Sequence, residues 1–566
     1  SYSLTTHPDA DLDDQVDEVI ALLAAAQQPD GYLNTYFTVV KPGERWTDLR
    51  DAHELYCAGH LIEAGVAHFQ ATGKRALLDV VCRYADHIDT VFGRDPGQKR
   101  GYCGHEEIEL ALIKLYRVTG ETRYLRLAKY FIDERGRQPY YFDLEAASRG
   151  TPGYHEDHRS HGSLRASREY NQAHLPVREQ HEVVGHAVRA MYLYSAMADL
   201  AGETGDESLR AACRRLWDHL CAKRLYVTGG NGSAAQNEGF TADYDLPNES
   251  AYAETCAAIG LVFWAHRMAQ LEGDGRYADV LERALYNGVL SGVSLDGTRF
   301  FYENPLASRG DVTRKEWFGV ACCPPNLARL LASLGQYIYS IDESGVAVHL
   351  YIQGSAQVTL QGQPVTLRQE TDYPWDGKVK LRVSPSQPAE FTVCLRLPGW
   401  CRDATLLVNG EQVNLGEHVS KGYARITRTW AHGDVVELDL PMPVQRVYAH
   451  PRVSADAGCV ALQRGPLIYC LEEVDNPVAL YRVSIDPEAS IAAHRDAALL
   501  GSIVTLRGDG YVDDETGWDG MLYRHAAPTQ TPASLTAIPY HMWDNRQSGQ
   551  MRVWIREADR HPANKS

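Results

Sequence analysis

The chain has 566 residues, of which 44% are hydrophobic and 23% charged, with a formal net charge of −18 from 56 Lys and Arg against 74 Asp and Glu. This length and composition exclude a small disulfide-stapled fold and a disordered chain, and they predict several domains or one large domain with satellites. The acidic balance argues against a nucleic acid or an anionic membrane as a partner. The sequence has no apolar stretch of transmembrane length.

Twelve cysteines are too sparse for a disulfide scaffold, so we expect a reducing compartment, the cytoplasm. The chain starts Ser1-Tyr2-Ser3-Leu4, without an initiator Met and without a charged-then-apolar leader. We interpret this start as that of a fragment whose beginning is missing.

From Leu12 to about Ile341 the apolar residues recur at spacings of three and four, which predicts amphipathic helices. Three similar turns, around Gly73, Gly120 and Gly273, end one helix and start another, as in repeated helical hairpins. The predicted helices span 12–28, 53–72, 75–92, 105–118, 121–133, 180–201, 207–223, 250–271, 276–291 and 326–341. They make five hairpins, whereas the common closed ring has six, so we expect a ring that lacks its first pair.

After about Ser344 the periodicity changes to two, as in Val346 to Ile352, which predicts strands. Asn409-Gly410 lies between two strand-like runs and predicts a tight hairpin turn. The alternation restarts near Arg446. The predicted fold is therefore an α+β multidomain protein. An (α/α)6 helical barrel is expected over residues 1–342, one β-sandwich domain over 343–445 and a second over 446–566.

Cys322-Cys323-Pro324-Pro325-Asn326 is the sharpest local motif. Adjacent cysteines have Cα atoms about 3.8 Å apart, too close for an ordinary disulfide, and the prolines restrict the backbone that presents them. Two thiols held side by side suggest a metal ligand pair. Two buried small apolar residues before a helix would give the same pattern.

Glu254 and Cys256 form a second candidate ligand pair. On a regular helix, residues two apart point about 200° away from each other, so both reach one ion only at a helix start or a distorted turn. Three thiolates and one carboxylate would complete a tetrahedral zinc shell. The separation of 68 residues (322 − 254) makes the spacing alone a weak signal.

The glycine-rich loop from Gly229 to Phe240 carries Glu238. Its glycines do not follow a strand of a βαβ unit, which argues against a phosphate cradle. Loops on a rigid scaffold often carry catalytic groups, although a solvated loop acid has the same signature. His53, His105 and His186 lie near predicted helix starts, where a structural histidine is equally compatible with the pattern.

Together these segments resemble the bacterial β-L-arabinofuranosidases of glycoside hydrolase family 127. A weaker match, Leu397–Trp400, continues the resemblance into the β half. The matching stretches of the helical half are Gln28–Thr35, His53–His60, Gly104–Glu109, Val184–Arg189, Glu254–Cys256 and Cys322–Asn326.

The resemblance implies a ring of six helical hairpins, β-sandwich domains, and a retaining hydrolase that releases L-arabinose from non-reducing-end β-L-arabinofuranosides. Its substrate would be an arabinofuranose-containing oligosaccharide or glycoconjugate, and we expect a homodimer. The implied roles are Cys322 as nucleophile, Glu238 as general acid/base, Zn²⁺ ligation by Glu254, Cys256, Cys322 and Cys323, and sugar contacts from His53, His105, His186 and Tyr302. Family members begin earlier, with a segment that helps to close the ring and adds a substrate contact.

The expected chemistry follows from the same residues. A retaining glycosidase places an acid on one side of the scissile bond and a nucleophile on the other. A free thiol with a pKa near 8.5 is mostly protonated at neutral pH, whereas a metal-bound thiol is deprotonated. A zinc-bound Cys322 would give a thioglycosyl-enzyme, and Glu238 would protonate the leaving oxygen and then activate water.

The sequence leaves three alternatives open. One is a hydrolase of another plant cell-wall furanoside. A second is another enzyme class, since helical rings also house sugar epimerases, lyase-like hydrolases and zinc-dependent thioether-forming cyclases, although the cyclases lack the paired motifs seen here. The third is a carbohydrate-binding or assembly protein in which a closed zinc site with three Cys and one Glu only braces the ring.

Overall fold

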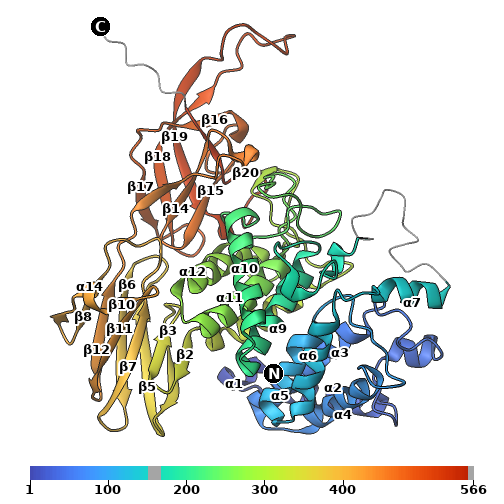
Figure 1. Cartoon of the computed structure of the whole chain (residues 1–566). Helices are drawn as coiled ribbons and strands as arrows, with labels where there is room; N and C mark the ends of the chain where they lie inside the picture. Colours follow the sequence, from blue (N-terminus) through green and yellow to red (C-terminus); the bar gives the residue numbers. More distant parts are fainter. Residues whose placement is uncertain (151–166, 559–566) are drawn as a thin grey trace, which may run out of the picture.

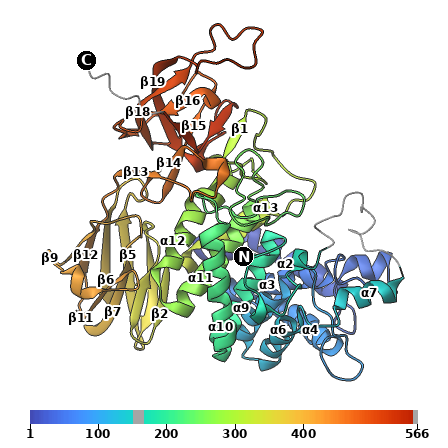
Figure 2. The ribbon, with the colours of Figure 1, turned by 45° about the horizontal axis from the view of Figure 1, so that its top comes forward.

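The computed structural model describes residues 1–150 and 167–558 of the chain. A helical body, coloured blue to light green, lies beside a yellow and orange pair of sheets, and a red sheet domain stands above both (Figure 1). The three bodies remain distinct when the view is tilted (Figure 2). Within the described residues, none of the helices has the length and apolar character needed to cross a membrane.

The helices of the first body form a closed circuit of contacts. α3 packs on α5, α5 on α9, α9 on α11 and α11 on α13, while α13 reaches α1, which returns to α3. α4, α6, α10 and α12 pack against members of this circuit, and α2 packs on α4. The bounds are α1 (Tyr2–Thr6), α2 (Ala10–Ala26), α3 (Glu54–Thr72), α4 (Ala76–Val91), α5 (Ile108–Thr119), α6 (Thr122–Glu134), α7 (Tyr141–Arg149), α9 (Ala187–Thr204), α10 (Glu207–Lys223), α11 (Thr255–Glu272), α12 (Gly275–Arg283) and α13 (Cys323–Ala332).

The predicted hairpin turns are confirmed. Gly73, Gly120 and Gly273 end α3, α5 and α11 with φ of 74°, 75° and 61°. Each glycine amide donates to a carbonyl four residues earlier, and the next helix begins within three residues. A glycine adopts this left-handed conformation without the steric cost of a Cβ atom.

Several helix starts differ from the predicted ones, and each difference moves a site residue off the helix. α5 begins at Ile108 rather than 105. α9 begins at Ala187 rather than 180, because Gly185 turns the chain just before it with a φ of 71°. α11 begins at Thr255 rather than 250. The apolar spacing predicts no helix where α7 forms.

α13 is shorter than predicted and lies earlier, over Cys323–Ala332 instead of 326–341. Its two prolines fit the first turn, where an amide hydrogen has no intrahelical partner to lose. Residues 339–342 form a strand rather than the end of this helix. They pair with Gly345–Val348, so the next body begins before the predicted boundary at 343.

The second body is a β-sandwich. One sheet has the order β10-β11-β7-β3-β2 and the other the order β4-β5-β6-β12-β8-β9. Their inner faces share one apolar core, which includes Val393 and Leu381 from opposite sheets. The bounds are β2 (Tyr339–Asp342), β3 (Gly345–Val348), β4 (Gly354–Leu360), β5 (Gln363–Thr371), β6 (Lys378–Pro385), β7 (Ala389–Arg396), β8 (Thr405–Val408), β9 (Glu411–Gln412), β10 (Val419–Ser420), β11 (Tyr423–Trp430) and β12 (Asp434–Asp439).

The predicted turn at Asn409-Gly410 joins β8 to β9. Both residues have positive φ, 53° and 82°, as a two-residue hairpin turn with this sequence requires. This prediction is confirmed.

The third body is a closed barrel rather than the predicted second sandwich. β14 pairs with both β15 and β21, so the strands β15-β19-β18-β16-β21-β14 return to their starting point around their own apolar core. β1 (Ala307–Arg309), from the helical half, pairs with β20 at one edge. The bounds are β13 (Val444–Val447), β14 (Cys459–Arg464), β15 (Leu467–Glu472), β16 (Val483–Ile485), β17 (Ala492–Asp496), β18 (Ile503–Asp513), β19 (Gln530–Pro539), β20 (Gln550–Arg552) and β21 (Ile555–Glu557).

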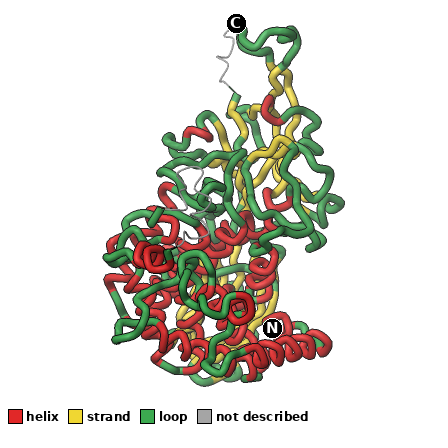
Figure 3. The backbone as a smooth tube through the Cα atoms, turned by 90° about the vertical axis from the view of Figure 1, so that its right-hand side faces the viewer, coloured by secondary structure: helices red, strands yellow, loops and turns green. Residues whose placement is uncertain are grey.

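Buried polar contacts join the bodies. The guanidinium of Arg396, on β7, pairs with Asp279 at 2.7 Å and with Glu282, both on α12. The Asn287 amide accepts from the backbone N–H of Ile468 at 2.8 Å and thereby ties the helical body to the barrel. Figure 3 shows the red helical body below the sheet domain, seen from the side. These contacts mount the helical body on both sheet domains.

Candidate active site

One cavity of about 910 Å³ opens where the helices of the circuit begin. α3, α9, α11 and α13 each contribute from their first turns or from the residue just before, and the loop before α5 contributes His105. Helix N-terminal ends carry a partial positive charge and unpaired amides, which favours acidic groups there. Among the lining residues are His53, Tyr56, His60, His105, Tyr170, His186, Arg189, Tyr192, Glu238, Glu254, Cys256, Tyr302, Cys322, Asn326 and Arg329.

The predicted ligand residues meet at one point of this cavity. The Sγ atoms of Cys256 and Cys323 are 3.5 Å apart, and those of Cys322 and Cys323 are 3.8 Å apart. Glu254 Oε1 lies 3.3 Å from Cys322 Sγ and 3.7 Å from Cys323 Sγ. All four ligand atoms lie within 4.8 Å of one another, although 68 residues separate the two pairs in the sequence (322 − 254).

Both pairs are positioned by helix starts, as their spacing required. Glu254 is the residue before α11 and has extended backbone, so its side chain and that of Cys256 turn to the same side. Asn304 holds this turn by donating to the Ala253 carbonyl and to Thr255 Oγ1, both at 2.9 Å. Cys322 is the residue before α13.

Burial limits the negative charge that the cluster of Glu254, Cys256, Cys322 and Cys323 can carry. Hydrogen bonds with the thiols of Cys256 and Cys323 lower the pKa of the Cys322 thiol to about 3. Burial raises the pKa values of Glu254, Cys256 and Cys323 well above their ordinary values. Burial therefore favours the protonated forms of Glu254, Cys256 and Cys323, and a bound cation would favour their ionised forms.

The donor set fits zinc. Four ligands at the usual zinc distances of about 2.0–2.3 Å stand about 3.5–3.8 Å apart at the corners of a tetrahedron. Four of the separations within the cluster, 3.3 to 3.8 Å, match that size. Cys323 and Cys256 are buried, whereas Cys322 is partly exposed and lines the cavity. Cys322 is thus the thiol that a ligand in the cavity meets most directly.

Glu238 lies in the same cavity on a loop clamped by two glycines. A Cβ atom on Gly239 would stand 1.8 Å from the Gly185 carbonyl oxygen, and one on Gly185 would stand 1.9 Å from the Glu169 oxygen. The Ala187 amide donates to the Glu238 carbonyl at 3.0 Å. Three chain segments are therefore stacked at backbone contact distance, with the segment of Gly185 between those of Glu169 and Glu238.

Two side chains, His186 and Tyr170, contact the carboxylate of Glu238. His186 Nε2 lies 2.9 Å from Glu238 Oε2, and the Tyr170 hydroxyl donates to the same oxygen at 3.5 Å. His186 is the residue before α9, so this helix start orients the acid. A carboxylate that has hydrogen-bonding partners and yet lines a cavity is suited to proton transfer.

The other predicted site residues also lie here. His53 precedes α3 in a left-handed conformation, and its Nδ1 lies 2.6 Å from the Asp51 carbonyl oxygen. The ring of His105 lies 5.4 Å from that of His186 and 5.8 Å from that of His53. Burial lowers the pKa of His105 well below its ordinary value, so this imidazole is neutral. The Cys322 thiol lies 3.0 Å from the Tyr302 hydroxyl oxygen and donates to it.

Sequence reasoning missed several residues that line the cavity, among them Tyr56, Asn326 and Arg329. Asn326 and Arg329 lie four and seven residues after Cys322 on α13, where helical spacing places them on the same side. That spacing is a usable signal once α13 is known to begin at Cys323.

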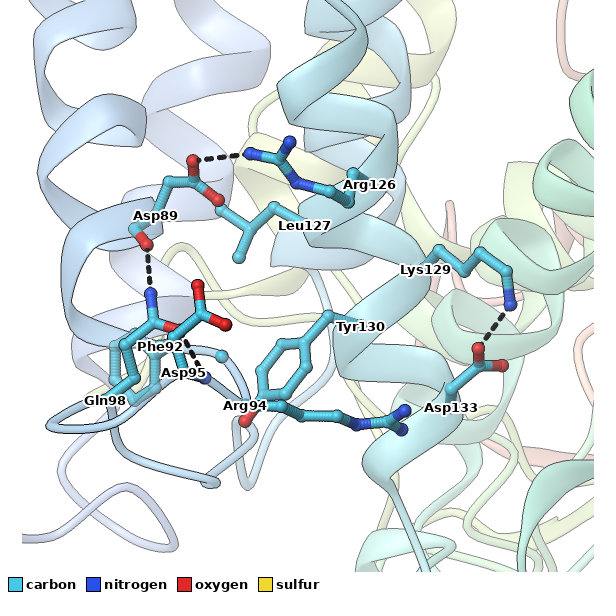
Figure 4. Close-up of a pocket in the computed structure, with 11 residues that line it drawn as sticks. Asp89, Phe92, Arg94, Asp95, Gln98, Arg126, Leu127, Lys129, Tyr130 and Asp133 are labelled. Atoms are coloured by element: carbon cyan, nitrogen blue, oxygen red, sulfur yellow. Dashed lines mark hydrogen bonds and ion pairs between the residues drawn. The ribbon is translucent and has the colours of Figure 1, made fainter.

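A second cavity, of about 550 Å³, lies on the outer side of the ring, where α6 and the end of α4 line it (Figure 4). Four of its charged groups pair with one another, Arg126 with Asp89 at 3.1 Å and Lys129 with Asp133. The predicted site residues do not line it.

Family models match the three bodies in turn. Residues 1–336 match the β-L-arabinofuranosidase, glycoside hydrolase family 127 catalytic domain. Residues 345–442 match the middle domain of the same family, and residues 444–556 its C-terminal domain.

Individual proteins agree with these matches. A non-reducing end β-L-arabinofuranosidase of Bifidobacterium longum subsp. longum is 40% identical over 589 aligned positions, which cover 98% of this chain and 87% of that protein. A crystal structure of a family 127 β-L-arabinofuranosidase from Geobacillus stearothermophilus T6 has a TM-score of 0.95 and 54% identity, covering 98% of this chain and 88% of that one. Another structure, named a family 127 β-arabinofuranosidase, has a TM-score of 0.87, 40% identity and coverages of 98% and 86%. The resemblance predicted from the motifs is confirmed, and the chain belongs to glycoside hydrolase family 127.

Proposed function

We propose that this chain is a retaining β-L-arabinofuranosidase that releases L-arabinose from the non-reducing ends of arabinofuranose-containing oligosaccharides or glycoconjugates. The observation that carries the proposal is that the cluster of Glu254, Cys256, Cys322 and Cys323 and the acid Glu238 line or adjoin one cavity. The relatives named as arabinofuranosidases at 40% and 54% identity support the sugar class.

Glu254, Cys256, Cys322 and Cys323 would hold Zn²⁺. When bound, the ion keeps its thiol ligands deprotonated at neutral pH and reduces the repulsion between them. The Tyr302 hydroxyl, 3.0 Å from Cys322 Sγ, would donate a hydrogen bond to that sulfur once it is a thiolate. The remaining chemistry belongs to side chains of the chain itself.

Cys322 acts as the nucleophile in this proposal. Its sulfur attacks the anomeric carbon while Glu238 gives a proton to the departing glycosidic oxygen, so the glycosidic C–O bond breaks as a C–S bond forms. Glu238 then takes a proton from water, whose oxygen attacks the anomeric carbon and releases the thiolate. Two inversions give net retention.

The histidines and Tyr302 would bind the sugar. His53, His105 and His186 stand in one row of ring contacts beside Glu238, and neutral imidazoles can donate and accept hydrogen bonds with hydroxyl groups. His186 also keeps the Glu238 carboxyl in place between its two proton transfers. The histidine side chains that line the cavity can thus bind sugar hydroxyl groups, and His105 does so as a neutral imidazole.

We also propose that the closed circuit of α1, α3, α5, α9, α11 and α13 is the inner ring of an (α/α)6 barrel. The twelve cysteines are all free thiols, which supports a reducing compartment, the cytoplasm.

We further propose that the protein is a homodimer. Light scattering during gel filtration measures the molar mass and so tests this.

The test is release of p-nitrophenol from its β-L-arabinofuranoside, with and without a zinc chelator, and with the anomer of the first-formed arabinose followed by NMR. Hydrolysis that gives the β anomer, stops with chelator and returns with Zn²⁺ supports every part of the proposal. Chelator-insensitive hydrolysis would contradict the metal role, and a first-formed α anomer would contradict the covalent intermediate. Binding of the sugar without hydrolysis would favour a carbohydrate-binding protein.

A further inference from the structure

We propose that Arg329 is a positioning residue that ties the nucleophile helix α13 to the opposite side of the ring and thereby keeps Cys322 and Cys323 in reach of Glu254 and Cys256. This inference rests on the proposed function of the cysteine cluster. Arg329 lies on α13, seven residues after Cys322, and its side chain is largely buried at the edge of the cavity.

The guanidinium of Arg329 binds two other helices of the ring. Its Nη1 lies 2.8 Å from Glu63 Oε2 on α3 and 3.5 Å from Glu107 Oε1, at the residue before α5. His60 Nδ1, also on α3, lies 3.3 Å from the same nitrogen. One side chain therefore joins the last helix of the circuit to its earlier members.

The charges around this contact are nearly balanced. Lys114, on α5, pairs with Glu63 from the other side. Burial opposes ionisation of Glu63, yet the charges of Arg329 and Lys114 hold its pKa below the ordinary value. Burial and the neighbouring charge of Glu63 raise the pKa of Glu107. Without Arg329, Glu63 would still face Lys114, so the buried site would keep one charge of each sign.

Arg329 also rests on aromatic side chains of two other helices of the circuit, α11 and α9. Its guanidinium carbon lies 4.7 Å from the ring centre of Phe263 on α11 and 5.6 Å from that of Tyr192 on α9. Tyr192 in turn accepts a hydrogen bond at 3.0 Å from the amide of Asn326, one turn earlier on α13. The inner face of α13 is thereby held along its length.

The need for such an anchor follows from the geometry of the cluster. Cys322 and Cys323 come from α13, whereas Glu254 and Cys256 come from the start of α11, and α13 is a helix of only ten residues. A tetrahedral site loses metal affinity when its two halves shift relative to each other. Changing a residue that orients the ligands without binding the metal typically weakens metal binding about 10- to 100-fold.

The experiment compares wild type, Arg329→Met and Arg329→Lys. Zn²⁺ affinity is measured by chelator competition, and the cobalt-substituted proteins are compared by their thiolate-to-cobalt absorption bands. We expect Arg329→Met to bind Zn²⁺ about 10- to 100-fold more weakly and to show shifted cobalt bands. Arg329→Lys should recover part of both, because an ammonium keeps the charge and loses the forked contacts.

Arg396→Met is the matched control, because Arg396 is also a buried arginine paired with two acids, Asp279 and Glu282, and it lies on a different body. It should lower the unfolding temperature without moving the cobalt bands or the Zn²⁺ affinity. If Arg329→Met keeps wild-type affinity and wild-type bands, the positioning role is wrong. If the wild type itself shows no thiolate-to-cobalt bands, the metal part of the proposed function fails instead.

Discussion

The two reactive sides of the cavity are held by different kinds of structure. On the cysteine side, the ligands sit at the starts of α11 and α13, and side chains such as Asn304 and Arg329 hold those helices. On the acid side, Glu238 sits in a loop whose position comes from backbone contact through Gly239 and Gly185. The cysteine side depends on side-chain partners. The backbone of the acid loop depends on the absence of side chains at Gly239 and Gly185.

The comparison shows which changes each side should tolerate. Helix starts are rigid, so the cysteine side loses function when a ligand or an anchoring partner is removed. A stacked loop has no room for an added atom, so the acid side loses function when a methyl group is inserted. The two sides meet through the Ala253 amide, which donates to the Gly232 carbonyl at 2.7 Å just before Glu254.

The largest effect should come from the cysteine side. Cys322→Ser removes the thiolate, and we expect kcat to fall by about 10⁴-fold or more, the range found when an enzymatic nucleophile is lost. Steady-state kinetics on the p-nitrophenyl glycoside measure it. Cys394→Ser, a buried thiol of the sandwich, is the control that should keep its rate. Wild-type turnover in Cys322→Ser with zinc present would show that another group attacks.

Glu238→Gln should cost about 10²- to 10⁴-fold in kcat, the usual contribution of a general acid/base. The loss should be greater for a glycoside with a poor leaving group than for p-nitrophenol, because the latter needs less protonation. Zinc content, measured by atomic absorption, should not change. Glu249→Gln, an exposed acid outside the cavity, is the control. Equal losses on both substrates would argue against proton donation by Glu238.

Gly239→Ala tests the stacked loop without touching a reactive group. The added methyl would stand 1.8 Å from the Gly185 oxygen, so the loop must move, and we expect about a hundredfold loss of kcat. Zinc affinity should stay at the wild-type value. Gly43→Ala, where a Cβ atom meets nothing within 4 Å, should be silent. An active Gly239→Ala variant would mean that the loop position does not matter.

Asn304→Ala should have the smallest effect on catalysis. It removes hydrogen bonds to Ala253 and Thr255 from a buried site, which lowers the free energy of unfolding by about 1–3 kcal/mol. Because the ligands remain, we expect only a few-fold weaker zinc binding. Urea unfolding and chelator competition measure the two quantities. A zinc loss as large as that expected for Arg329→Met would reverse the order of importance of the two anchors.

Much of the local structure could be predicted from the sequence. The glycine turns at Gly73, Gly120 and Gly273 and the Asn409-Gly410 hairpin formed as expected, because each depends on neighbouring residues and on φ values that glycine and asparagine tolerate. The starts of α5, α9, α11 and α13 were misplaced by three to seven residues. The apolar spacing continues through those loops, so the helix ends depend on packing.

The sequence by itself determined the family, the hairpin repeats and the residue types able to hold a metal, since these are written in short motifs and local periodicity. Only the tertiary structure decided that Glu254 and Cys322 meet, that Cys322 is the accessible thiol, that Arg329 pairs with Glu63 of another ring helix, and that the last domain is a barrel. Each of these joins residues far apart in the chain. Their proximity results from the packing of whole helices and strands, which local preference does not specify.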